Sequence, residues 1–283
     1  MNYRHIYHAG NFCDIIKHLT LIAILKNLLK KPKPFAVLDG FAGVGIYDVT
    51  SEAANKTRES ELGVRKLFEV YDALLPDFPP LLSDLMQIIR STGSQNLYPG
   101  SPLIIKSLIR PIDQLIACEL HKQDYEYLKD VINTGTHNLD AYLALKAFLP
   151  FEEKRGLVFL DPPFEERDEF SKLVKALRLI KTRAENICTL IWYPVKVAEH
   201  VQQFYTECKS IGFKEILKIE FELLNKMLAP SYDLIQKEEK YYMNKCGLLI
   251  INPPYIQDEL ELNIDHIAKQ VYNMQAKYVI ELL

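Results

Sequence analysis

The sequence has few of the residues that build a metal centre or a disulfide framework. Its five cysteines in 283 residues stand far apart, at Cys13, Cys118, Cys188, Cys208 and Cys246. No two of them form a C-x-x-C pair, and no histidines cluster at the spacing of zinc ligands. We therefore expect no bound metal and a reducing, cytoplasmic environment.

The sequence also lacks a long apolar run and a strong charge imbalance. No stretch of about 18 apolar residues is present to cross a membrane, and the start, "MNYRHIYHAG", has no apolar signal core. The formal net charge of −3 neither requires nor excludes a nucleic-acid partner. We expect a monomer without a membrane partner.

A third absence concerns the glycine turn after the first predicted sheet strand, at residues 35–38. Asp39 follows this strand, and Gly43 and Gly45 lie in the turn "GFAGVG", where glycines let the backbone approach a ligand closely. The dinucleotide fingerprint G-x-G-x-x-G would need a third glycine where Asp48 stands. The turn therefore favours a nucleoside cofactor without a pyrophosphate over NAD.

Strand-like runs alternate with helical patterns along most of the chain, which predicts an α/β fold with a mostly parallel, doubly wound sheet. The segment 52–96 has helical periodicity only. We predict a main domain from residues 1–51 and 97–283, with a helical insertion subdomain at 52–96. The final predicted strand, "CGLLII", is expected to be antiparallel because a polar, mixed segment precedes it.

Acids follow three successive predicted strands. Glu119 ends the second, where a carboxylate can accept both ribose hydroxyls, and Asp140 follows the third, where it can meet an adenine amino group. Each acid alone is more often a cap than a ligand. Together with Asp39, and without a phosphate cradle, they favour S-adenosylmethionine, which carries a sulfonium and no phosphates.

The motif "DPPF" at 161–164 follows the fourth predicted strand, which neighbours the first at the switch point of a doubly wound sheet. The Asp161 carboxylate and the Pro162 carbonyl can accept the two N–H hydrogens of an exocyclic amine and stabilise positive charge as a methyl group arrives. Phe164 can stack on a flipped-out base for about 1–3 kcal/mol. We predict a methyltransferase with these three residues as its catalytic motif.

A second copy of the pattern, "NPPY" at 252–255, follows the strand expected to be antiparallel. Its end should emerge at the opposite edge of the sheet, roughly 17–20 Å from the transferred methyl. We predict that Asn252 has no catalytic role.

The stretches "YRHIYHAGNFCDIIKH", "LDGFAGVGIY", "YPGSPL" and "LDPPF" resemble the bacterial 23S rRNA (adenine-N6)-methyltransferases of the RlmJ type. The resemblance runs from position 3 to about position 254. It implies a Rossmann-like class I S-adenosylmethionine-dependent methyltransferase fold, with a seven-stranded sheet whose last strand is antiparallel. It also implies methylation of one adenosine of 23S rRNA, in protein-free RNA or an early assembly intermediate.

Carried over by position, the resemblance implies residue roles. With the residue analysis above, the cofactor set comprises Lys17, His18, Asp39, Gly43, Ser101, Glu119, Asp140, Ala141 and Asp161. The N-terminal motif at 3–18 interleaves aromatic and cationic groups, which suits phosphate contact and base stacking. The substrate set comprises Tyr3, Arg4, His5 and Phe164. The family often has histidine where Phe41 stands and glycine where Ala141 stands.

Two other readings stay open. A DNA adenine-N6 or cytosine-N4 methyltransferase could use the same motif, because "DPPF" serves any exocyclic amine. A non-catalytic nucleic-acid-binding protein could keep the same fold. The absence of a large recognition domain argues against sequence-specific DNA work, whereas the helical insertion could grip an RNA stem by its shape.

Overall fold

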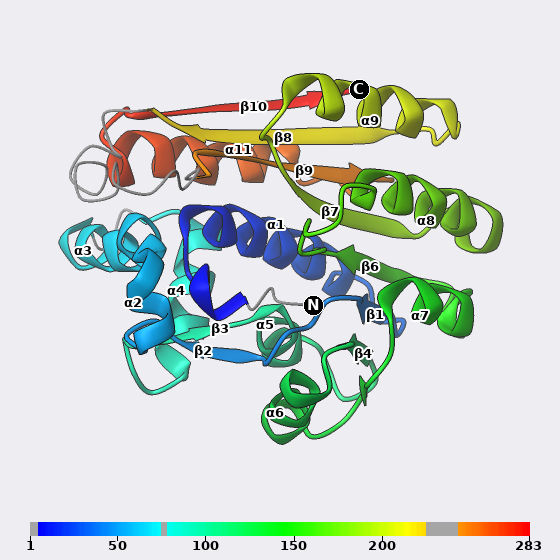
Figure 1. Cartoon of the computed structure of the whole chain (residues 1–283), viewed down its shortest axis with the longest axis horizontal. Helices are drawn as coiled ribbons and strands as arrows, with labels where there is room; N and C mark the ends of the chain where they lie inside the picture. The colour runs from blue at the N-terminus through cyan, green and yellow to red at the C-terminus, as the bar shows by residue number, and fades with distance from the viewer. Residues whose placement is uncertain (1–4, 75–77, 225–242) are drawn as a thin grey trace.

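A computed structural model of the chain describes residues 5–74, 78–224 and 243–283 (Figure 1). Its centre is an eight-stranded sheet. The strands are β1 (Ala36–Asp39), β4 (Gln114–Cys118), β5 (Thr136–His137), β6 (Gly156–Leu160), β7 (Cys188–Pro194), β8 (Ile216–Leu223), β9 (Lys245–Ile251) and β10 (Ala276–Leu282). They lie in the order β10-β8-β9-β7-β6-β1-β4-β5.

The directions of the strands confirm a Rossmann-like class I methyltransferase fold. β5, β4, β1, β6 and β7 pair in parallel, so their carboxyl ends meet at one edge of the sheet. β9 is antiparallel to both of its neighbours, β7 and β8, as predicted. β1 and β6 are adjacent, which confirms the predicted neighbourhood of the first and fourth strands.

The predicted number of seven strands is wrong, because β10 adds an eighth, antiparallel to β8 at the sheet edge. The strand at 245–251 is therefore not the last one. Side chains of β10 alternate between half-buried and exposed positions, whereas β6 is buried throughout.

Helices cover both faces of the sheet. Alternate strand residues point to opposite sides, so Val37 packs in one core and Leu38 in the other. The first core is covered by α1 (Phe12–Leu29), α5 (Ser101–Leu108), α6 (Lys122–Ile132) and α11 (Gln257–His266), which continues into a π-helical turn at Ile267–Val271. The second is covered by α7 (Ala141–Phe148), α8 (Glu169–Ala184) and α9 (Ala198–Ser210), grouped at the right in Figure 1.

The segment 52–96 lies between the two strands of a small antiparallel pair, β2 (Ile46–Asp48) and β3 (Leu97–Pro99). It contains α2 (Glu52–Thr57), a 3₁₀ turn at Glu59–Leu62, α3 (Val64–Leu74) and α4 (Pro80–Ser91). These helices gather at the left of Figure 1, and buried side chains of α3 and α4 share one core with α1. Its assignment as a separate subdomain stays a prediction.

Within the described residues, no helix is long and apolar enough to span a membrane. The same residues contain no group of three or more potential metal ligands.

Candidate active site

A cavity of about 520 Å³ opens at the carboxyl edge of β1, β4 and β6. Most of the predicted cofactor residues line it: Lys17, His18, Gly43, Ser101, Glu119, Asp140, Ala141 and Asp161. Phe41 and His5 line it as well. The structure thus brings residues from four strand ends and the N-terminal helix to one site.

Glu119 is fixed by the glycine turn. Its carboxylate accepts hydrogen bonds from the Gly43 N–H at 2.9 Å and the His121 N–H at 2.7 Å. Burial nevertheless raises the pKa of Glu119 above its ordinary value. Gly43 has a φ of +62°, and a Cβ there would approach the Tyr47 hydroxyl to 2.0 Å, so a side chain would displace this turn.

Asp140 and Ser101 lie at helix starts on the cavity wall. Asp140 is the N-cap of α7, and its side chain accepts from the Leu143 N–H at 2.9 Å. Ser101 is the first residue of α5 and is buried. Asp140 therefore has a capping role and also faces the cavity.

Asp39 is fully buried and does not line the cavity. Among the described residues, neither of its carboxylate oxygens has a hydrogen-bond partner. Burial raises the pKa of Asp39 to about 7. The Ser101 hydroxyl and the Phe41 N–H oppose this shift, although they lie outside hydrogen-bond geometry. Asp39 thus lies behind the cavity wall, and its contact with a cofactor stays a prediction.

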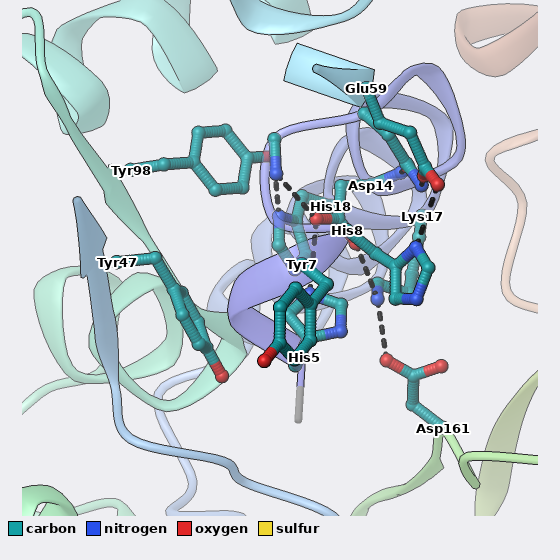
Figure 2. Close-up of polar contacts among 12 residues, drawn as sticks. His5, Tyr7, His8, Asp14, Lys17, His18, Tyr47, Glu59, Tyr98 and Asp161 are labelled. Carbon is teal, nitrogen blue, oxygen red and sulfur yellow. Dashed lines mark hydrogen bonds and ion pairs between the residues drawn. The ribbon is translucent and has the colours of Figure 1, made fainter. Parts of the chain in front are cut away.

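Asp161 directly follows β6 and faces α1. Its Oδ2 atom accepts from the Lys17 ammonium at 2.5 Å, and the same ammonium lies 2.7 Å from Asp14 Oδ1 (Figure 2). Burial opposes the charge of Lys17, but the two carboxylates hold its pKa well above the ordinary value. Lys17 is therefore a buried ammonium ion between two carboxylates.

The N-terminal segment packs over this ion pair. His5, in a 3₁₀ turn at His5–Tyr7, has its Nε2 atom 3.1 Å from Asp14 Oδ2. His18 Nδ1 lies 2.8 Å from the Tyr98 hydroxyl, and burial lowers the pKa of His18 to about 3, so this imidazole is neutral. The predicted substrate residues Tyr3 and Arg4 lie outside the described residues.

A second cavity, of about 120 Å³, adjoins the first and shares His5, Lys17, Asp161 and Pro163 with it. Phe164 and Trp192 form part of its wall, with ring centroids 6.0 Å apart and an edge-to-face geometry. Phe164 has a φ of +50°, a conformation that a bulky residue rarely adopts. Pro162 lines neither cavity.

Sequence reasoning missed several wall residues of the second cavity, among them Asp14, Glu59 and Trp192. Asp14 precedes Lys17 by three residues on a helix, a spacing that brings side chains together, so it could have been found. Glu59 comes from the helical insertion, and its carboxylate lies 2.8 Å from His8 Nδ1. Nothing local in the sequence indicates that contact.

The second proline motif lies elsewhere. Because β9 is antiparallel, Ile251 pairs with Thr189 near the start of β7, at the opposite edge of the sheet from Asp161. The Asn252 amide donates to the backbone carbonyls of Glu185 and Ile187 at 2.7 and 3.0 Å. The predicted strand direction is confirmed, and Asn252 lines neither cavity.

The chain is similar to proteins of one family along most of its length. A family model described as "Ribosomal RNA large subunit methyltransferase D, RlmJ" matches residues 32–282. Ribosomal RNA large subunit methyltransferase J of Haemophilus influenzae is 34% identical over 260 residues, which cover 90% of this chain and 88% of that protein. The Escherichia coli protein of the same name is 31% identical over 268 residues, with 93% and 91% coverage. The crystal structure of a Legionella pneumophila protein, 30% identical, matches with a TM-score of 0.83 over 97% of this chain and 98% of that one.

Proposed function

The chain belongs to the RlmJ family of large-subunit ribosomal RNA methyltransferases, and we propose that it methylates the exocyclic N6 amine of one adenosine in 23S rRNA. S-adenosylmethionine is its cofactor. One observation carries the proposal: Asp161 lies where a large cavity, lined by the predicted cofactor residues, meets a smaller one lined by Phe164.

The residues of the large cavity fit S-adenosylmethionine. A volume of about 520 Å³ is in the range of small-molecule sites. Each Glu119 carboxylate oxygen accepts one backbone N–H and can accept a ribose hydroxyl as well, and Asp140 faces the cavity as an acceptor for an amino group. When bound, the cofactor supplies an electrophilic methyl group on a sulfonium ion.

Asp161 orients the amine that receives the methyl group. Lys17 holds its Oδ2 atom, whereas no described residue donates a hydrogen bond to Oδ1. Oδ1 and the Pro162 carbonyl accept the two N6 hydrogens, which draws the nitrogen lone pair out of the ring and toward the methyl group. The Asp161 carboxylate then stabilises the positive charge that develops on the nitrogen.

The smaller cavity holds the flipped-out base. Its wall combines apolar groups, Pro163, Phe164 and Trp192, with polar groups of the N-terminal segment. Stacking on Phe164 offsets part of the few kcal/mol that extrusion of a base costs. Tyr3, Arg4 and His5 contact the RNA around the target nucleotide.

We further propose that the enzyme acts as a monomer in the cytoplasm without a bound metal. Its substrate is protein-free 23S rRNA or an early assembly intermediate.

Transfer of a labelled methyl group from S-adenosylmethionine tests the proposal. Protein-free 23S rRNA, intact 50S subunits and duplex DNA are offered in parallel, and digested nucleosides are identified by mass spectrometry. We expect N6-methyladenosine from the protein-free rRNA. Labelling of DNA alone would favour the DNA methyltransferase, and absence of S-adenosylmethionine binding in calorimetry would favour a non-catalytic protein.

A further inference from the structure

Asp14 is a buried carboxylate at the centre of the N-terminal segment, and none of the roles above uses it. It is 1% exposed and lies in the first turn of α1. Oδ1 lies 2.7 Å from the Lys17 ammonium, while Oδ2 accepts from the Gly10 N–H at 2.8 Å and lies 3.1 Å from His5 Nε2 (Figure 2). One carboxylate thus joins Lys17 to His5.

We infer that Asp14 is a positioning residue for methyl transfer, which acts on Asp161 through Lys17; this inference rests on the proposed function. Lysine has a flexible four-carbon stem and no fixed hydrogen-bonding plane. A second carboxylate on the side away from Asp161 fixes the ammonium. The Asp161 carboxylate is then held in the orientation that presents Oδ1 to the amine.

The charges in this cluster support the same role. Asp14, Lys17 and Asp161 together carry one net negative formal charge, His18 next to them is neutral, and His5 offsets that charge only when it is protonated. That surplus charge favours the cation that forms on N6 during methyl transfer. Without Asp14, the Lys17 ammonium would balance the charge of Asp161 by itself, and the net negative charge of the cluster would be lost.

Burial shows that Asp14 depends on its partners. Burial by itself would raise the pKa of this carboxyl, but Lys17 and His5 hold it well below its ordinary value. A buried charge without a partner is strongly destabilising, so Asp14 and Lys17 form a unit. Asp14 also lies at the positive end of a helix dipole and donates its N–H to Asn11 Oδ1 at 2.9 Å. The test must separate this helix-start role from positioning.

A double-mutant cycle separates the two roles. It compares the wild type, Asp14→Asn, Lys17→Met and the double variant, with kcat and KM on 23S rRNA, S-adenosylmethionine affinity by calorimetry and Tm as readouts. We expect Asp14→Asn to lower kcat by about 10- to 100-fold, because misplacement by about 1 Å has effects of that size. In the Lys17→Met background, the same substitution should change kcat less than about 3-fold, since the residue through which Asp14 acts is gone.

The ion pair between Lys26 and Asp84 provides a matched control. Lys26 lies on the same helix, α1, and neither residue lines either of the two cavities described above. Asp84→Asn should lower Tm slightly and leave kcat unchanged. If Asp14→Asn does not fold, the double variant, which removes both buried charges, is compared with Lys17→Met alone.

Two results would overturn the inference. Additive effects of Asp14→Asn and Lys17→Met on kcat would show that Asp14 acts independently of Lys17. A change confined to Tm or KM would show a helix-start role only. A wild-type enzyme inactive on 23S rRNA would overturn the proposed function as well, whereas an active wild type with additive variants would overturn this inference alone.

Discussion

The proline motifs at 161–164 and 252–255 have the same order of residue types, an acid or amide, two prolines and an aromatic, but they lie at opposite edges of one sheet. β6 is parallel to β1, so Asp161 emerges beside the glycine turn and the cavities. β9 is antiparallel to β7, so Asn252 emerges beside the start of that strand. Strand direction, which a motif does not encode, decides which copy meets a cofactor.

The two motifs also differ in how far their polar groups are satisfied. The Asn252 amide gives its hydrogens to two backbone carbonyls, and Tyr255 is fully exposed. Asp161 keeps an oxygen without a described donor, and Phe164 faces a cavity. At the carboxyl edge, the acidic residue of the motif keeps an acceptor oxygen for a ligand. At the opposite edge, the amide of the same motif hydrogen-bonds the protein backbone instead.

Removal of the Asp161 carboxylate should have the largest effect. We expect Asp161→Ala to lower kcat by about 10²- to 10⁴-fold, the range for loss of a group that manages protons and charge in the transition state. Because Lys17 keeps Asp14 as a partner, the fold should persist, and S-adenosylmethionine should still bind. Labelled methyl transfer and calorimetry measure the two effects.

A second variant tests whether the other motif can restore the activity lost in Asp161→Ala. Adding Asn252→Asp to Asp161→Ala converts the second copy to "DPPY" but leaves it at the wrong edge. The double variant should stay inactive. Recovered turnover would contradict the assignment of the two motifs.

The next largest effect is expected for Asp39→Asn, on the free energy of unfolding and its dependence on pH. Folding raises its pKa from 3.8 to about 7, so between these values the native state binds a proton that the unfolded state has released. The stabilisation is fully present below about pH 4 and is lost as the pH rises through 7. Asp39→Asn removes this titration, so between pH 5 and pH 8 the variant should gain about 3 kcal/mol relative to wild type, measured by urea unfolding.

Asp113, which precedes β4 at the amino edge, is the control. Its carboxylate accepts from the Phe35 N–H and from Arg110, and these bonds lower its pKa although burial opposes them. Its stabilisation is present above the ordinary carboxyl pKa and is lost as the pH falls through the lowered value, the opposite sign to Asp39. If Asp39→Asn and Asp113→Asn changed the pH dependence of the free energy of unfolding in the same direction, Asp39 would not be an unpaired buried acid.

Removing the aromatic side chain of each motif should change kcat/KM by different amounts, and by less than the loss of Asp161. Phe164→Ala removes a stacking surface worth about 1–3 kcal/mol, so kcat/KM for 23S rRNA should fall by about 5- to 150-fold. Phe164→Tyr keeps the ring and should retain activity. Tyr255→Ala, at a fully exposed position, should leave kcat/KM unchanged. A loss at Tyr255 matching that at Phe164 would place RNA contacts at both edges.

Much of the site was predictable because the carboxyl ends of parallel strands must meet. Glu119, Asp140 and Asp161 were placed together from their positions after strands, and they share one cavity. Asp39 has the same position in the sequence pattern, yet it is fully buried behind the wall. Side-chain direction at a strand end depends on packing, which residue order does not specify.

Contacts between distant segments could not be predicted. Glu59 meets His8 from 51 positions away, because the helical insertion folds back onto the N-terminal segment. β10 pairs with β8 across more than 50 positions of sequence, and which strand it pairs with depends on the rest of the sheet. Local sequence patterns identify helices and strands that have strong periodicity. Contacts between segments that are far apart in the sequence depend on tertiary packing, which such patterns do not describe.

Asn252→Ala should have the smallest effect, and on stability alone. Asn252 adopts a φ of +51°, which asparagine tolerates better than alanine, and its amide satisfies the carbonyls of Glu185 and Ile187. Loss of these bonds should lower the free energy of unfolding by about 1–2 kcal/mol, measured in urea, with kcat unchanged. Asn252→Gly, which removes the same bonds without the backbone strain, should be less destabilised than alanine. A fall in kcat comparable to that of Asp161→Ala would mean that Asn252 contributes to methyl transfer although it lies at the opposite edge of the sheet.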